Sequence, residues 1–342
     1  MKTKTIRILF LFFFSALLFT CKKNGGDEPV DPVDPPIDNT DSDIRITSKD
    51  YIKDLLFVSK NDYQIETSEP ATFSSTDPSI TITSEGLVKR VTSGEVVAID
   101  VTWTNSGEKS RIYAVGATDN NHVNPFVKFH AAYSDDPYGQ YVQGWETLRR
   151  LSEANSTFFI VLRHADADNG VDYNLKHDDA GPANWWMSCD STIARQLNAQ
   201  GIARAKELGT VFKDLKLPIA RVISSEFCRA VTTAELINAG PTIVKDGRLN
   251  HPDYLKSGKS VFNGFRDIIK EQPVDNKITL ISTHHPINEF NNSGIATFPK
   301  VSVFNWTGAY FVKEKSDKTY TYEGAVSWGM FKYWRDKKLG RL

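Results

Sequence analysis

The stretch FFIVLRHADA, residues 158–167, decides the expected fold. Its apolar run from Phe158 to Leu162 is typical of a fully buried strand, and the run stops at Arg163 and His164. A buried strand usually ends in a turn residue such as Gly, Asn or Asp, so the basic pair suggests a different role. Ligands of α/β sheets bind beyond the carboxyl ends of the strands, and the pair is therefore a candidate for a binding site.

The segments that follow alternate between helix and strand. After Gly201, apolar residues at helical spacing indicate one buried face: Ile202, Ala205, Leu208, Phe212 and Leu215. Residues 220–225 and 277–283 are expected to be strands, and a second helix between them would bury Ala230, Thr233, Ala234 and Ile237. Residues 307–328 indicate a hairpin at a sheet edge, with its turn near Ser316. This order predicts an α/β domain with a mostly parallel sheet flanked by helices.

Polar and basic residues follow three of the expected strands. They are Arg163 with His164, Ser224 and Ser225 with Arg229 opening the next helix, and His284 with His285. If the strands are parallel, their ends converge, and two arginines and two histidines face one small volume. Arginine offers paired N–H donors and a helix N-terminus favours phosphate, so such a pocket suits a tetrahedral dianion.

Four segments resemble the histidine phosphatase superfamily, which has the phosphoglycerate mutase-like fold. LRHADA is similar to its Arg-His signature, SSEFCRAVTTAE to its second block and STHHP to the block with the second histidine, while ARQLNAQGIARAKELG resembles the helix between the first two blocks. The resemblance spans residues 155–342. Blocks in this order and spacing are more specific than a lone Arg-His pair.

The resemblance implies a mechanism and assigns roles to four residues. His164 would be the nucleophile and form a phosphohistidine intermediate. Arg163, Arg229 and His284 would bind the phosphoryl oxygens and stabilise the transition state. No cofactor or metal is expected, because the arginines supply the positive charge that a metal ion would otherwise supply.

The sequence departs from the family pattern at the proton donor. Asn250 stands where mutase-like members carry glutamate, and His285 stands where acid phosphatase-like members carry aspartate. Three alternatives remain: His285 is the donor, Asp166 or Glu226 replaces it, or no donor exists. Losing general acid catalysis slows the departure of a poor alkoxide by about 10²–10⁴. We therefore expect better activity on good leaving groups than on alkyl phosphates.

Two cysteines, Cys189 and Cys228, remain after the N-terminal region. In an oxidising compartment an even pair favours a disulfide, and two buried free thiols are the alternative. The loop before Cys189 holds Trp185, Trp186 and Met187. These three side chains either line the substrate pocket or pack in the core of the loop.

The first residues are typical of an exported lipoprotein. Lys2, Lys4 and Arg7 precede a short apolar run that ends in LFTC, with Cys21 as the expected lipidated residue. Thr20 is larger than the usual residue before that cysteine, and an ordinary cleaved signal is the alternative. We expect residues 1–20 to be the signal peptide and Cys21 to anchor the chain on the periplasmic or cell-surface face of a bacterial outer membrane.

Three segments separate the expected anchor from the α/β domain. Residues 21–43 are acidic and rich in proline, and are expected to be an extended tether. In residues 44–118, Val97 to Trp103 alternates apolar and polar residues as a half-buried strand does. This segment resembles the bacterial Ig-like domains of group 2, which implies an all-β sandwich used as a spacer. Residues 119–154 are expected to be a connecting segment.

Charge and composition limit the partners of the protein. Lys and Arg number 41 against 42 Asp and Glu, which gives a formal net charge of −1 and no indication of nucleic-acid binding. The leading hypothesis is a lipid-anchored phosphatase acting on phosphorylated small molecules or glycans. The alternatives are a non-catalytic relative that binds phosphate or a phosphoglycan, and a surface adhesin that uses the Ig-like domain. The oligomeric state does not follow from the sequence.

Overall fold

The computed structural model describes residues 43–116, 156–172, 181–250, 261–284 and 305–342, apart from residues 53, 59, 60, 93, 169 and 171. The expected lipidation site Cys21, the connecting segment and His285 lie outside these residues. Within them, no helix has the length and apolar character needed to cross a membrane.

The C-terminal part is built on a six-stranded sheet with the order β11-β10-β12-β9-β13-β14. The strands are β9 (Ser156–Arg163), β10 (Ile219–Ser224), β11 (Ile243–Lys245), β12 (Ile278–Thr283), β13 (Ala309–Lys315) and β14 (Tyr320–Val326). Strands β9 to β12 pair in parallel, and the β13–β14 hairpin adds antiparallel strands at one edge. The predictions of a mostly parallel sheet and of an edge hairpin are therefore confirmed.

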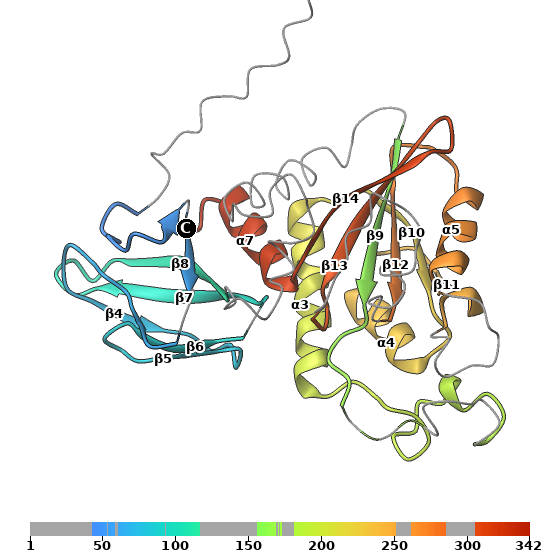
Figure 1. Cartoon of the computed structure of the whole chain (residues 1–342), viewed down its shortest axis with the longest axis horizontal. Helices are drawn as coiled ribbons and strands as arrows, with labels where there is room; N and C mark the ends of the chain where they lie inside the picture. The colour runs from blue at the N-terminus through green and yellow to red at the C-terminus, as the bar shows by residue number, and fades with distance from the viewer. Residues whose placement is uncertain are drawn as a thin grey trace, which may run out of the picture. The chain divides into compact units, whose positions relative to one another are not determined.

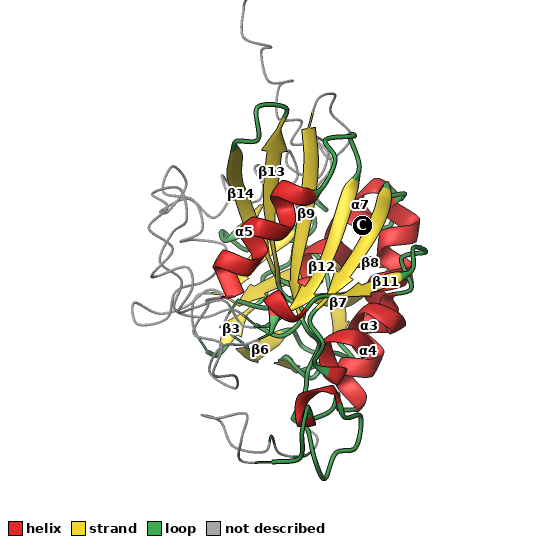
Figure 2. Cartoon of the chain, turned by 90° about the vertical axis from the view of Figure 1, so that its right-hand side faces the viewer, coloured by secondary structure: helices red, strands yellow, loops and turns green. Residues whose placement is uncertain are grey.

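Helices cover both faces of this sheet, which explains the unbroken apolar run in β9 (Figures 1 and 2). The helices are α3 (Ala199–Leu215), α4 (Cys228–Ile237), α5 (Val261–Glu271) and α7 (Trp328–Lys338). Phe158, Ile160 and Leu162 belong to the core that includes residues of α3, α4 and α7. Phe159 and Val161 belong to a second core with residues of α5. Since successive side chains of a strand point to opposite faces, all five positions are apolar.

The helix predictions need one correction. On α3 the expected residues Ala205, Leu208, Phe212 and Leu215 are buried, but Ile202 is 38% exposed. The prediction that Ile202 lies on the buried face is therefore wrong. The side chain buried near that end of the helix is the charged Arg204, which is 5% exposed. Helices α5 and α7 were not expected from the sequence.

The N-terminal part is rich in strands and contains two sheets. A five-stranded sheet has the order β1-β2-β8-β7-β4, and a three-stranded sheet the order β3-β6-β5. The strands are β1 (Tyr51–Ile52), β2 (Leu55–Val58), β3 (Tyr63–Gln64), β4 (Ala71–Ser74), β5 (Ile80–Ile82), β6 (Leu87–Val91), β7 (Val96–Trp103) and β8 (Lys109–Gly116). Val97, Ile99, Val101 and Trp103 are buried in a core shared by both sheets, as their alternation predicts.

Helix α7 packs closely against strand β7. A Cβ atom added at Gly329 would lie 1.7 Å from the carbonyl oxygen of Val96, so only glycine permits this approach. Nearby, the hydroxyl of Tyr113 on β8 donates a 2.6 Å hydrogen bond to the buried carboxylate of Asp336. Leu55, Val96, Tyr113 and Val115 share the core that contains residues of α3 and α7. The N-terminal sheet is thus packed against the α/β part.

A buried ionic cluster accompanies this apolar contact. The guanidinium of Arg204 on α3 lies 3.6 Å from Glu95, next to β7, and 3.3 Å from Asp166. It also donates a 2.9 Å hydrogen bond to the hydroxyl of Ser79. Burial raises the pKa of Glu95 to about 7, although Arg204 acts in the opposite direction. The contact therefore includes a carboxyl that ionises near neutral pH.

Replacing Glu95 with glutamine should remove a pH dependence of stability. The folded protein holds the proton of Glu95 up to about pH 7, whereas an unfolded glutamate releases it near pH 4.3. The folded state binds more protons between these values, so the stability of the wild type should fall as the pH rises through them. Between pH 5 and pH 8 we expect the wild type to lose about 2 kcal/mol more unfolding free energy than Glu95→Gln. Urea unfolding at both pH values measures this difference.

Glu66→Gln is the matched control, because Glu66 is an exposed glutamate of the same part of the chain. It should keep the pH dependence of the wild type. The same pH dependence in all three proteins would contradict the account of Glu95.

Candidate active site

The side chain of His164 is held as a neutral imidazole. It follows β9 directly and is 3% exposed. Its Nδ1 lies 2.9 Å from the carbonyl oxygen of Ala165, and since that oxygen only accepts, Nδ1 carries the proton. The Nε of Arg229 donates a 3.2 Å hydrogen bond to Nε2 of His164, so Nε2 presents a lone pair. The two contacts together select one neutral tautomer.

Burial and neighbouring charges keep this imidazole neutral. Burial lowers the pKa of His164 well below its usual value, and the positive charges of Arg229, Arg163 and Arg195 lower it further. A proton on Nε2 would face the Arg229 guanidinium without an acceptor. Nε2 is therefore unprotonated over a wide pH range, and its lone pair can act as a nucleophile once the hydrogen bond from Arg229 is released.

The second histidine lies beside the first. His284 follows β12, whose last residue Thr283 pairs with Arg163 in the parallel register, and the two imidazole centroids are 5.3 Å apart. Ser225 donates its hydroxyl proton to the side-chain oxygen of Asn250 at 2.9 Å. That hydroxyl lies 2.8 Å from Nε2 of His284, so it can accept only if this nitrogen is protonated. With the hydroxyl proton on Asn250, Nε2 of His284 is the donor in this contact.

Three arginines surround His164. Arg163 ends β9 and stacks over the indole of Trp306, with 3.6 Å from its guanidinium carbon to the ring centroid. Arg229 lies in the first turn of α4 and is 1% exposed. Arg195 precedes α3 and lies 6.0 Å from the centroid of the same indole. The structure therefore brings together Arg163, Arg229, His164 and His284, the four residues selected from the sequence.

An aspartate of the chain binds two of these arginines. The buried carboxylate of Asp172 accepts a 2.9 Å hydrogen bond from Arg229 and lies 3.2 Å from Arg195. It also accepts a 3.1 Å hydrogen bond from the backbone N–H of Arg195. A carboxylate thus occupies part of the donor set that would bind an anion.

Sequence reasoning did not identify three residues of this site, namely Arg195, Asp172 and Trp306. Arg195 could have been found, because it stands at the start of the ARQLNAQG segment and is one of few charged residues there. Asp172 and Trp306 lie in loops, where spacing carries no signal, and only the fold brings them to His164.

The two described proton-donor candidates, Asp166 and Glu226, have different partners. Burial raises the pKa of Asp166, whereas its ion pair with Arg204 lowers it. Glu226 accepts a 2.7 Å hydrogen bond from the side-chain amide of Asn250. Asn250 thereby connects Glu226 to Ser225 and His284. The third candidate, His285, lies outside the described residues.

A disulfide fastens the loop before α3 to the start of α4. Cys189 and Cys228 are bonded, with 5.4 Å between their Cα atoms, and Cys228 directly precedes Arg229. In the same loop Trp185 is 1% exposed and packs on Phe227 with ring centroids 5.8 Å apart. Met187 is 43% exposed. Trp185 is therefore a core residue of the loop.

Comparisons with known proteins give partial matches. A model of the histidine phosphatase superfamily (branch 1) matches residues 180–257, which include Arg229 but neither His164 nor His284. No curated protein sequence matches the chain. A solved structure of the protein histidine phosphatase SixA complexed with tungstate is 16% identical, with a TM-score of 0.36, and the match covers 51% of this chain and 97% of that one.

Two further solved structures illustrate the range of similar proteins. The mycobacterial glucosyl-3-phosphoglycerate phosphatase is 13% identical with a TM-score of 0.36, and the match covers 50% of this chain and 99% of that one. A phosphoglycerate mutase from Plasmodium falciparum is 13% identical with a TM-score of 0.32, covering 49% of this chain and 89% of that one. The matches to these three solved structures each cover about half of this chain.

Removing the disulfide should destabilise the protein. The bond closes a loop with a sequence separation of 39, for which loop-closure entropy corresponds to about 4 kcal/mol. We expect the double variant Cys189→Ala, Cys228→Ala to lose roughly 2–4 kcal/mol of unfolding free energy in urea. Dithiothreitol should lower the stability of the wild type and leave that of the double variant unchanged. A wild type that is insensitive to the reductant would contradict the role of the bond.

Proposed function

We propose that residues 155–342 form a phosphatase that hydrolyses phosphomonoesters through a phosphohistidine on His164. The observation that carries this proposal is the lone pair on Nε2 of His164, which faces the guanidinium of Arg229 in a buried cluster of cations. A neutral imidazole is a nucleophile, and guanidinium groups neutralise the charge of a phosphoryl group in transfer. Both requirements are met at the same point of the sheet.

In the first step, Arg229 exchanges its hydrogen bond to Nε2 of His164 for one to the phosphoryl group, and Nε2 attacks phosphorus as the bond from phosphorus to the ester oxygen breaks. The electron pair of that bond leaves with the oxygen, which takes up a proton. Nδ1 keeps its hydrogen bond to Ala165 and carries the positive charge that develops on the ring. Arg229 and Arg163 offset the charge of the equatorial oxygens. Hydrolysis follows when water attacks phosphorus and gives a proton to the carboxylate that protonated the ester oxygen. The N–P bond then breaks, its electron pair returns to Nε2, and inorganic phosphate leaves.

Among the described donor candidates, Asp166 fits the proton transfer best. Its carboxyl is buried and its pKa is raised, which keeps a proton on it closer to neutral pH. It stands two residues after the nucleophile and lines a cavity beside Trp306. Glu226, by contrast, is engaged by Asn250 in the network that leads to His284. We assign the donor to Asp166 in this proposal.

In the resting site, Asp172 is the anion held by Arg229 and Arg195. A phosphoryl group that binds to Arg229 must share this guanidinium with Asp172 or displace the carboxylate. Asp172 therefore lowers the affinity of the site for inorganic phosphate, the product. The carboxylate and the phosphate would share one guanidinium, and the two anions repel each other. This favours release of phosphate after hydrolysis.

The cellular setting is part of the same proposal. The signal-like N-terminus and Cys21 support an exported protein anchored in a membrane through lipid. The strand-rich part would be the Ig-like domain, and the acidic, proline-rich segment would be the tether below it. Substrates would be phosphorylated small molecules or glycans outside the cytoplasm.

The direct test is the hydrolysis of p-nitrophenyl phosphate in excess EDTA by the wild type and by His164→Ala. We expect the wild type to be active and insensitive to EDTA, because arginines supply the positive charge. His164→Ala should lose activity by at least about 10³-fold, since the attacking atom is missing. Phosphate release measures both effects.

His251→Ala is the control, since His251 is a histidine to which no role is assigned, and it should retain activity. An active His164→Ala enzyme would exclude His164 as the nucleophile, and inhibition by EDTA would contradict a metal-independent reaction. An inactive wild type that still binds phosphate would favour the non-catalytic relative.

A further inference from the structure

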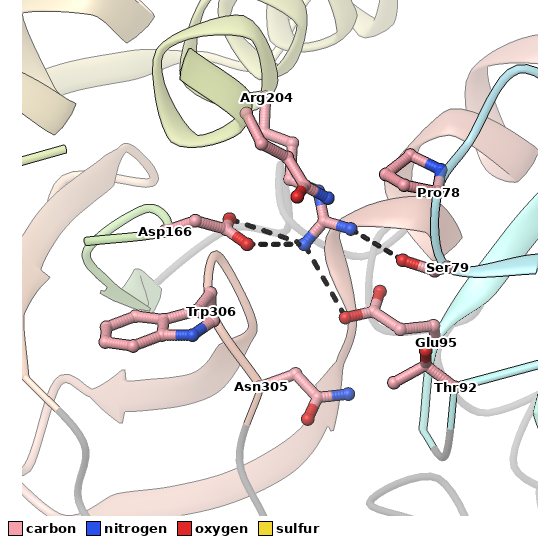
Figure 3. A pocket seen from close by; sticks show the side chains of 9 residues that line it. Pro78, Ser79, Thr92, Glu95, Asp166, Arg204, Asn305 and Trp306 are labelled. Carbon is pink, nitrogen blue, oxygen red and sulfur yellow. Dashed lines mark hydrogen bonds and ion pairs between the residues drawn. The ribbon is translucent and has the colours of Figure 1, made fainter. Parts of the chain in front are cut away.

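A cavity of about 240 Å³ lies where the strand-rich part meets the α/β part (Figure 3). Ser79, Thr92 and Glu95 line it from the N-terminal side. Asp166, Arg204 and Asn305 line it from the α/β side. Two parts of the chain that are far apart in sequence thus form one concave surface.

The cavity adjoins the nucleophile. The indole of Trp306 is part of its wall, and the centroid of the same indole lies 5.0 Å from that of the His164 imidazole. The guanidinium of Arg163 covers this ring. Asp166, also in the wall, stands two residues after His164. Trp306 and Asp166 thus belong both to the wall of the cavity and to the immediate surroundings of His164.

The charges of the wall disfavour a second anion. Arg204 is paired with both Asp166 and Glu95, at 3.3 Å and 3.6 Å, and donates to Ser79. Glu95 is 4% exposed and Arg204 5%. Because the guanidinium of Arg204 is already engaged by Asp166, Glu95 and Ser79, an entering phosphate or carboxylate would have to displace one of these partners to bind it.

The remaining wall groups suit hydroxyls. The side-chain amides of Asn305 and Gln200 and the hydroxyl of Thr92 each donate and accept hydrogen bonds. The indole of Trp306 adds a large, mostly apolar side chain to the wall. Pockets for drug-sized ligands measure about 300–1,000 Å³, so this smaller cavity fits one ring rather than a large molecule.

We propose that this cavity is the subsite for the leaving group, and that it accepts an uncharged, hydroxyl-bearing group such as the sugar ring of a sugar monophosphate. The proposal rests on the proposed function, because the phosphoryl end must lie on His164. It also gives the strand-rich part a second role. Residues Ser79, Thr92 and Glu95 of that part would contact substrate, so it would be more than a spacer.

Two substrates allow the subsite to be tested independently of the phosphoryl site. Glucose 6-phosphate carries a sugar ring, whereas acetyl phosphate has a small leaving group that does not need the cavity. The variant Thr92→Tyr fills the cavity from the N-terminal side. We expect its kcat/KM for glucose 6-phosphate to fall at least about 10-fold, because the ring loses its space, and its kcat/KM for acetyl phosphate to stay within about 2-fold.

Asn305→Ala removes an amide from the opposite wall and should show the same selectivity in weaker form, which covers the case in which Thr92→Tyr fails to fold. The control Glu66→Gln should leave kcat/KM unchanged for both substrates. Equal losses on both substrates, or no loss on either in both cavity variants, would overturn the proposal.

The design distinguishes failure of the subsite from failure of the proposed function. If the wild type hydrolyses neither substrate, the proposed function fails. Calorimetric measurement of ligand binding then tests whether the cavity is a sugar site. Tighter binding of glucose 6-phosphate than of inorganic phosphate to the wild type, lost in Thr92→Tyr, would support the cavity as a sugar site. Equal affinities for the two ligands would overturn it.

Discussion

The hydrogen bond from Nε of Arg229 to Nε2 of His164 is the contact on which the site depends. It is possible only because the ring nitrogen on the other side donates to Ala165 and because burial keeps the imidazole neutral. The parallel register of β9, β12 and β10 then brings His284 and the start of α4 to the same sheet edge. The fold thus places cations around a lone pair that none of them can protonate.

The same arrangement extends beyond the α/β part. Arg204 joins Asp166, two residues after His164, to Glu95 and Ser79 of the strand-rich part. Buried ion pairs are expensive unless their geometry is satisfied, and they are weak evidence of stability alone. Their position gives them a functional reason here, since they line a cavity together with Trp306 (Figure 3), and the indole of Trp306 packs on His164. A domain that the sequence suggests is a spacer would thereby help to select the substrate.

The buried strand and the basic residues that follow it could be predicted from the spacing of apolar residues in the sequence. The run Phe158 to Leu162 predicts a strand covered on both faces, and the two cores confirm it. The prediction that Ile202 is buried is wrong, because this side chain is exposed. Near that end of α3 the buried side chain is Arg204, which forms ion pairs with Glu95 and Asp166. Helix α7 gave no amphipathic stripe because it is buried on several sides, with Phe331, Trp334 and even Asp336 inaccessible. Asp172 and Trp306 reach the site through loops, and no local pattern reveals them.

Trapping the covalent intermediate tests the central claim most directly. A substrate labelled with ³²P is mixed with excess enzyme, the reaction is quenched in alkali, and the labelled peptide is identified by mass spectrometry. The account predicts an acid-labile, alkali-stable phosphate on His164, and no label on that peptide in His164→Ala. Label on another residue, or substrate turnover without any enzyme-bound phosphate, would contradict it.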